Sequence, residues 1–256
     1  MNKYILIKYQ LCALIVCLFI ITDSYAKNND VCEFEIAPYL WAINMNGHER
    51  IGPLDAHINE NFSDLLKTLN WGGMLQLGAR KDKYGVFIDA TYAKTSDKET
   101  ISAGTLKLTT KYGIFSAGAF YSVYVKKYAK NNLLAIEPYL GARYTLNDAK
   151  IENLNNGVSA SKNKNWTDPI IGSRVRYIKN NWQLFLVGDV GGTNFNNNKS
   201  LNLVGLLGYT PASAQYFTVY LGYRYLYQKY ISGEADKLFA WNMRLFGPLL
   251  AVAFKF

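Results

Sequence analysis

Long apolar runs and helical periodicity are both missing from most of this sequence. After Ala26 no stretch has the roughly 20 apolar residues that a transmembrane helix needs. The one segment with helical spacing is short, at 61–70, where Ser63 would cap an amphipathic turn inside a loop. The sequence therefore argues against a helical membrane protein and against an α-helical domain.

Cysteine and histidine are also scarce, with three and two copies in 256 residues. Cys12 and Cys17 lie in a segment that we expect to be removed, so Cys32 would be left without an intrachain disulfide partner. Both histidines, His48 and His57, fall in one expected loop near Asp55. A metal site needs three or four converging ligands, so two solvated loop histidines are the simpler interpretation, and we expect no metal and no cofactor.

The amino terminus has the three parts of a secretory signal peptide. Lys3 and Lys8 precede an apolar run at 11–21, and small residues lead to Ala26. A run of this length is too short to span a bilayer as a helix, which disfavours the alternative of a signal anchor. We therefore expect cleavage after Ala26, export, and a single domain over 27–256.

The mature chain would carry 26 basic and 18 acidic residues, a net charge of +8. Such a protein suits anionic partners, including nucleic acid, anionic lipid and lipopolysaccharide. The basic residues form no single patch, which disfavours nucleic acid. Six lysines in or near expected outer loops would instead lie near a lipopolysaccharide surface, although solvated loop charges are the default interpretation: Lys94, Lys98, Lys107, Lys150, Lys162 and Lys164.

Period-two alternation dominates the rest of the chain. In 85–93, for example, one face would hold Val86, Ile88, Ala90 and Tyr92 and the other Phe87, Asp89 and Thr91. Ten such segments are expected, at 33–46, 70–81, 85–95, 104–125, 133–147, 166–178, 182–194, 200–210, 215–228 and 238–256.

The connections alternate between short turns (82–84, 126–132, 179–181, 211–214) and generally longer loops (47–69, 96–103, 148–165, 195–199, 229–237). Short turns at one rim and longer loops at the other are typical of outer-membrane barrels. We therefore predict an all-β fold, a closed antiparallel transmembrane β-barrel of about ten strands, with 8 to 12 allowed. A soluble β-sandwich is the alternative, but it would carry more charge on the second face of each strand.

Four prolines lie inside or near the ends of these expected strands, at Pro38, Pro138, Pro169 and Pro248. Proline cannot donate to a strand ladder, so we expect each at a bulge or where a strand leaves its neighbour.

Several short motifs carry a resemblance: "APYLW" (37–41), "DPIIGSR" (168–174), "GYRY" (222–225) and the closing "GPLLAVAFKF". The chain resembles a group of mostly uncharacterised bacterial outer-membrane β-barrel proteins, similar to small OmpA-type and porin-like barrels. The resemblance implies that the barrel-assembly machinery reads a terminal signal made of Leu250, Val252, Phe254 and Phe256. It implies no catalytic residues.

The inward face of the expected strands carries four acids and five arginines: Glu35, Asp89, Glu137 and Asp189, with Arg80, Arg143, Arg174, Arg176 and Arg224. These charges would form either an ion-selective pore lining or a plug of arginine–carboxylate pairs. Near-balance of charge and a count of ten strands favour the plug, because wide aqueous channels need about 16–18 strands.

An enzyme is disfavoured, since no histidine lies on an expected strand beside a nucleophile, and Asp89 and Glu137 are isolated carboxylates. We expect a Gram-negative outer-membrane barrel with a structural or surface-interaction role, its loops 47–69 and 148–165 making contacts. The alternative is a narrow channel for small polar solutes.

Overall fold

The computed structural model describes residues 32–101, 104–129, 132–155, 157 and 159–256. The expected signal peptide, with its cleavage position at Ala26, lies outside these residues.

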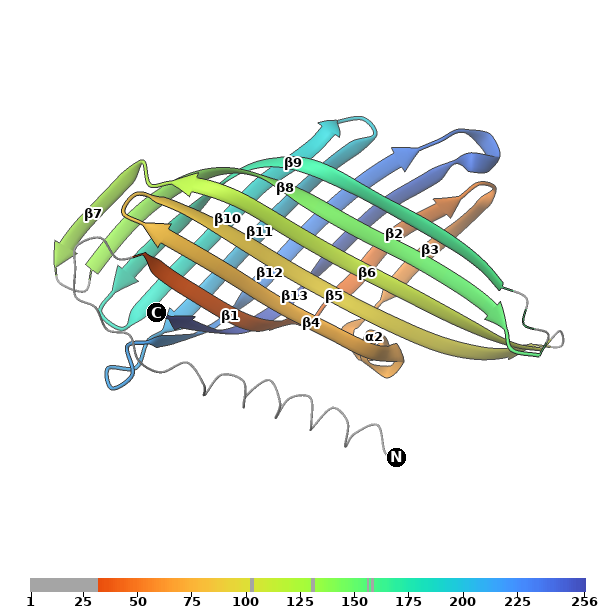
Figure 1. Cartoon of the computed structure of the whole chain (residues 1–256), viewed down its shortest axis with the longest axis horizontal. Helices are drawn as coiled ribbons and strands as arrows, with labels where there is room; N and C mark the ends of the chain where they lie inside the picture. The colour runs from red at the N-terminus through yellow and green to blue at the C-terminus, as the bar shows by residue number, and fades with distance from the viewer. Residues whose placement is uncertain (1–31, 102–103, 130–131, 156, 158) are drawn as a thin grey trace. The chain divides into compact units, whose positions relative to one another are not determined.

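The described chain forms one closed antiparallel β-barrel (Figure 1). The barrel closes where β1 pairs with β13, and backbone hydrogen bonds in both directions join Phe34 to Phe256. The strands are β1 (Glu33–Trp41), β2 (Asn44–Ile51), β3 (Leu54–Glu60), β4 (Leu69–Lys81), β5 (Tyr84–Ile101), β6 (Gly104–Tyr121), β7 (Tyr124–Ala129), β8 (Asn132–Asn153), β9 (Ser159–Lys179), β10 (Trp182–Asn194), β11 (Asn198–Tyr209), β12 (Phe217–Ser232) and β13 (Phe239–Lys255).

These strands occupy ten positions around the wall, which confirms the predicted fold and strand number. β1 and β2 share one position, because β1 pairs with one half of β13 and β2 pairs with the other. β6 and β7 likewise lie one after the other beside β8. β3 pairs with β2 outside this circuit.

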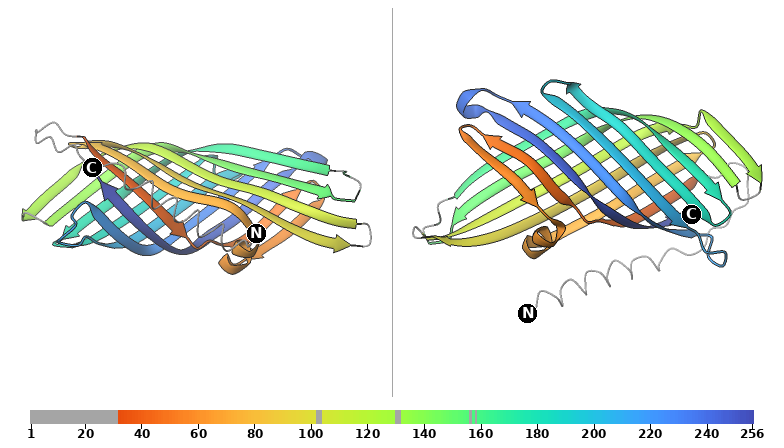
Figure 2. Two further views of the ribbon diagram at one scale, coloured as in Figure 1. Left: turned by 60° about the horizontal axis from the view of Figure 1, so that its bottom comes forward. Right: turned by 180° about the vertical axis from the view of Figure 1, so that it is seen from behind.

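One end of the barrel carries short connections and Phe256, and we call it the terminal rim. The opposite end carries long hairpins and is called the hairpin end; Figure 2 shows β2–β3, β10–β11 and β12–β13 projecting there, away from the carboxyl terminus.

At the hairpin end the observed strands extend further than the predicted ones, so the loops predicted there are too long. β5 and β6 stay paired as far as Ile101 and Gly104, and β8 and β9 as far as Glu152 and Ser159. Most of the hairpin β2–β3 likewise occupies the expected loop 47–69, and at the terminal rim β7 extends into the expected turn 126–132. Antiparallel hairpins need only backbone pairing with their neighbours, so these strands continue where the apolar alternation has stopped.

All four prolines lie where a ladder is interrupted. Pro38 is the last β1 residue paired with β4, and Pro169 precedes the first pair between β9 and β10. Pro138 is opposite the break between β6 and β7, and Pro248 is opposite the break between β1 and β2. The missing N–H of each proline is therefore placed where no partner strand requires it.

The expected helical turn is present as α2 (Phe62–Thr68), between β3 and β4. Its cap is Asn61 rather than Ser63, because the Asn61 side chain accepts a hydrogen bond from the Asp64 amide at 3.0 Å. A second short element, the 3₁₀ turn η2 (Ala235–Lys237), joins β12 to β13. Among the described residues no helix is long and apolar enough to cross a membrane.

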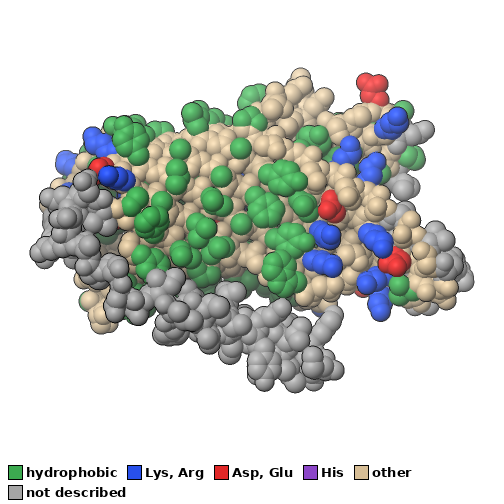
Figure 3. Space-filling view, in the orientation of Figure 1, with side chains coloured by type: hydrophobic (Ala, Val, Ile, Leu, Met, Phe, Trp, Pro, Cys, Tyr) green, Lys and Arg blue, Asp and Glu red, His purple; other side chains and the backbone are tan. Residues whose placement is uncertain are grey.

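The outer wall is apolar over the middle of the barrel. Figure 3 shows hydrophobic side chains gathered there, with charged side chains nearer both ends. Large apolar residues that are at least 37% exposed occur on β1, β4, β5, β8, β9, β10, β11, β12 and β13, among them Leu40, Leu75, Ile88, Leu140, Ile171, Leu186, Leu207, Leu221 and Leu250. Their neighbours in sequence point inward, so the barrel has an apolar exterior and a mixed interior.

Candidate functional site

The lumen near the terminal rim is organised around a single carboxylate. Glu137, on β8, is fully buried and accepts hydrogen bonds from Arg80 Nη2 at 2.5 Å, Arg174 Nη2 at 2.7 Å and Arg176 Nη2 at 3.3 Å. Arg174 also stacks over the Phe120 ring, with 3.6 Å from its Cζ to the ring centroid. One negative charge therefore serves three positive charges in a largely desolvated place.

A second buried pair joins β8 to β10 deeper in the lumen. Arg143 Nη2 donates to Asp189 Oδ1 at 2.7 Å, and both side chains are 1% exposed. Tyr139 also donates to Asp189, at 2.7 Å. A Cβ at Gly172 would lie 2.7 Å from the Tyr139 ring and 2.6 Å from the Asp189 Cβ, so glycine at this position lets the two side chains meet.

The third pair crosses the barrel from β12 to β5. Arg224 Nη1 donates to Asp89 Oδ1 at 3.0 Å, and Tyr39 donates to the other carboxylate oxygen at 2.9 Å. Asn202 links this pair to the second one, since it donates to Asp189 and accepts from Arg224. The structure thus brings eight of the nine expected lumen charges into three ion-paired groups.

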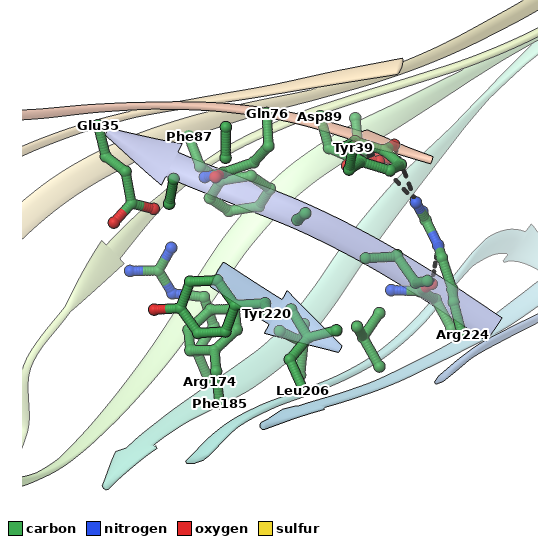
Figure 4. Close-up of a pocket in the computed structure, with 18 of the residues that line it drawn as sticks. Glu35, Tyr39, Gln76, Phe87, Asp89, Arg174, Phe185, Leu206, Tyr220 and Arg224 are labelled. Atoms are coloured by element: carbon green, nitrogen blue, oxygen red, sulfur yellow. Dashed lines mark hydrogen bonds and ion pairs between the residues drawn. The ribbon is translucent and has the colours of Figure 1, made fainter. Parts of the chain in front are cut away.

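The ninth charge, Glu35, lines an internal cavity of about 140 Å3. The cavity is bounded by all ten wall positions, and Figure 4 shows Glu35, Phe87 and Gln76 across it from Phe185 and Tyr220. Glu35 is the register partner of Lys255, which also lines the cavity. The cavity thus lies among the ion-paired side chains that fill the lumen around it.

The hairpin end of the lumen is closed by rings. Tyr112, Trp166, Tyr230, Phe239 and Trp241, here called the aromatic plug, come from β6, β9, β12 and β13. Trp166 stacks on Tyr230 with 4.7 Å between ring centroids, and Tyr112 stacks on Trp241 at 5.5 Å. Beneath the rings, Tyr112 donates to Gln228, which donates in turn to Thr145.

Sequence reasoning missed several polar residues of the lumen. Asp168 is 1% exposed, and neither of its carboxylate oxygens has a hydrogen-bond partner of acceptable geometry among the described residues. It shares the parity of Arg174 and Arg176 on β9, and this parity was the signal that could have found it. Lys255 shares the inward parity of Ala251 and Ala253 on β13, and this parity could likewise have identified it.

The two histidines face each other on the β2–β3 hairpin. They are register partners with ring centroids 4.8 Å apart, and His48 Nδ1 lies 3.7 Å from Asp55 Oδ1. Side chains of His48 and Asp55 are 59% and 56% exposed. Among the described residues, no group of three or more histidine, cysteine, aspartate or glutamate side chains is arranged to hold a metal ion.

The lysines expected near the outer surface divide into two sets. Lys94 and Lys98 on β5 are register partners of Lys111 and Lys107 on β6, and Lys98 and Lys111 are exposed. No ion pair joins these four to a described side chain, whereas Lys150 pairs with Glu152 at 3.1 Å. Lys162 and Lys164 instead share the inward parity of Trp166, and Lys164 donates to Ser232 at the mouth of the barrel.

The carboxyl-terminal row alternates as the sequence suggested. Leu250 and Phe256 are 49% and 50% exposed on the outer wall, while Ala251 and Ala253 are buried inside. Val252 and Phe254 share the outward parity. Recognition of this row during assembly stays a prediction.

Comparison with known proteins adds support for the fold. No family model matches the chain, and no curated protein matches it. Among solved structures, the outer membrane protease OmpT from Escherichia coli superposes with a TM-score of 0.56 at 8% identity, covering 92% of this chain and 100% of that one. Ail of Yersinia pestis reaches 0.38 at 11% identity, covering 88% and 98%. At such identities the likeness to OmpT concerns the fold alone.

Proposed function

We propose that this protein is an outer-membrane β-barrel with a closed lumen, and that it has a structural or surface-interaction role rather than a catalytic one. The apolar outer wall supports a location in lipid, because exposed leucine and isoleucine on nearly every strand would be costly in water. The expected signal peptide supports export to a Gram-negative envelope.

The orientation of the barrel in the membrane follows from the lengths of the connections at its two ends. In barrels of this kind short turns face the periplasm and long hairpins face outward, so the terminal rim would be periplasmic. The hairpins β2–β3, β5–β6 and β8–β9 would then project from the cell surface. During biogenesis, the barrel-assembly machinery would read Leu250, Val252, Phe254 and Phe256 at the periplasmic rim.

The proposal of a closed lumen rests on the side chains that fill successive levels along the barrel axis. The aromatic plug occupies the hairpin end, and the three ion-paired groups lie between it and the terminal rim. Each of the five lumen arginines is ion-paired with a carboxylate, so these charges are held in place across the lumen rather than lining an open path for ions.

Conductance across a planar bilayer tests this proposal. We expect the refolded wild-type protein to give no discrete openings, and the double variant W166A/W241A to give measurable ones, because two plug rings have been removed. The double variant W71A/W182A is the matched control, since both of these rings are 52–53% exposed on the outer wall. Reproducible wild-type openings whose size changes with R143Q or R174Q would overturn the closed lumen.

A narrow channel for small polar solutes is the second candidate, and the internal cavity is the observation that favours it. The same bilayer measurement separates the two candidates. For the location, a barrel in lipid should sediment with outer membranes and migrate faster on a gel before heating than after it. Recovery of the protein in the soluble periplasmic fraction would contradict the membrane location.

The outward lysines support contact with lipopolysaccharide. Like charges directly opposite each other on two strands destabilise a sheet, and phosphate groups would relieve this repulsion at Lys94–Lys111 and Lys98–Lys107. The variant K94Q/K98Q/K107Q/K111Q should retain less lipopolysaccharide than K126Q/K127Q, a control altered at the terminal rim. Equal retention by the two variants would remove this part of the proposal.

The histidines do not change the non-catalytic proposal. His48, His57 and Asp55 lie on a solvent-exposed hairpin, and the ring contact and ion pair of His48 are with the other two. Peptidase activity that is lost in H48A or H57A would overturn it.

A further inference from the structure

The part of the lumen next to the terminal rim holds more positive charge than its own carboxylates balance. Arg80, Arg174 and Arg176 share Glu137, and Lys255 faces Glu35 from the neighbouring strand. The two groups deeper in the barrel are each a one-to-one pair. The excess is therefore confined to the rim side of the cavity.

Two of these arginines also have unused donors. The Nε atoms of Arg174 and Arg176 are buried and have no hydrogen-bond partner among the described residues. A buried guanidinium N–H without an acceptor costs free energy that a suitable ligand would recover. Both side chains line the cavity.

Apolar side chains line the cavity next to these arginines. Phe185, Leu206 and Tyr220 lie on the same side as Arg174 in Figure 4, and the Arg174 Cζ is 5.8 Å from the centroid of the Phe185 ring. A cavity of about 140 Å3 is similar in size to apolar cavities that hold benzene. Guanidinium groups beside an apolar surface would suit a small molecule with an anionic head and a short apolar body.

Access is from the terminal rim. Exposure of the arginine side chains increases from 9% for Arg174 through 14% for Arg80 to 24% for Arg176. At the far end the aromatic plug closes the lumen. Among the described residues, the cavity is thus more accessible from the terminal rim than from the hairpin end.

We propose that this pocket binds a small organic monocarboxylate with an aromatic or short aliphatic body. The carboxylate lies against Arg174, Arg176 and Lys255, and the apolar body lies against Phe185 and Leu206. This assignment goes beyond the proposed location and closed lumen, and it does not depend on the hairpins.

Benzoate is the probe, with the protein folded in lipid nanodiscs and binding measured by isothermal titration calorimetry. We expect one saturable benzoate site, and binding of benzyl alcohol at least tenfold weaker, because the neutral analogue lacks the charge-assisted hydrogen bonds. R176Q should weaken benzoate binding about tenfold. R244Q, altered at an exposed outward arginine of β13, should leave it unchanged.

A steric variant tests the apolar part of the pocket. V204F places a ring on the cavity wall and should abolish benzoate binding. Each variant is first shown to fold by its faster migration on an unheated gel. No saturable benzoate binding, equal binding of benzyl alcohol, or inorganic phosphate binding that matches benzoate and survives V204F would each overturn the proposal. Bilayer conductance and membrane fractionation are read separately, so failure of benzoate binding leaves the proposed location standing.

Discussion

The two halves of the lumen are filled by different chemistry. Toward the terminal rim the interior is held by buried ion pairs centred on Glu137, Asp189 and Asp89, and a cavity remains among them. Toward the hairpin end it is held by stacked rings, and polar contacts such as Tyr112 to Gln228 lie at their edges.

The two halves differ because aromatic rings and charged side chains pack under different geometric constraints. Rings pack closely because dispersion contacts have little directionality. Charged side chains must keep hydrogen-bond geometry, and that requirement fixes where their atoms can lie. The cavity lies on the charged side, where the Nε atoms of Arg174 and Arg176 lack a hydrogen-bond partner among the described residues; the indole nitrogens of Trp166 and Trp241 in the plug lack one as well.

The largest expected effect comes from removing the shared carboxylate. E137Q leaves three buried arginines without a counter-charge, and we expect a loss of about 3–5 kcal/mol in the free energy of unfolding. Urea unfolding in lipid vesicles, followed by tryptophan fluorescence, measures it. E152Q, at an exposed ion pair on the same strand, should change stability by less than about 0.5 kcal/mol. A loss for E137Q as small as that for E152Q would show that Glu137 does not organise the rim half.

The second-largest expected effect comes from truncating a ring of the aromatic plug. Trp241 is 2% exposed, and W241A should cost about 3–4 kcal/mol by removing buried ring contacts and leaving a cavity. Trp71 is 52% exposed on the outer wall, so W71A is the control with a smaller expected loss. The temperature at which each folded gel band disappears gives the comparison. Equal temperatures for the two variants would contradict a stabilising plug.

The smallest expected effect concerns Glu49, beside the plug at the hairpin end. It lies on β2 opposite Trp241, beyond the outward Arg244 where the apolar wall has ended, and it accepts a hydrogen bond from Asn147 at 3.0 Å. Burial raises the pKa of Glu49 above its usual range. The folded protein therefore keeps this proton at pH values where the unfolded chain has released it, and stability falls as pH rises from about 4 toward neutrality.

E49Q keeps an acceptor for Asn147 but cannot ionise. Its stability relative to wild type should therefore increase between about pH 4 and pH 7, measured by urea unfolding at each pH. E60Q, an exposed position on the same hairpin, controls for loss of one carboxylate. A pH-independent difference for E49Q would mean that the Glu49 carboxylate is not desolvated.

Much of the barrel could be predicted because alternation is a local property. The apolar positions of 85–93 and 216–227 identify strands without any knowledge of their partners. The strand ends at the hairpin end were harder to predict, because β5 beyond Thr95 and β8 beyond Asn147 are mostly polar and still pair through their backbones. The short cap at Asn61 was misplaced because Ser63 was an equally suitable residue by type.

The sequence alone determined strand character, the even ring of ten and the inward parity of the charged residues, because each of these depends on residues two apart in one strand. Only the tertiary structure decided which charges meet. Register and strand tilt place Arg80, Arg174 and Arg176 on one Glu137, and they bring Asp89 of β5 to Arg224 of β12 across the barrel. Such contacts depend on side-chain reach and on the closure of the sheet, which no local pattern encodes.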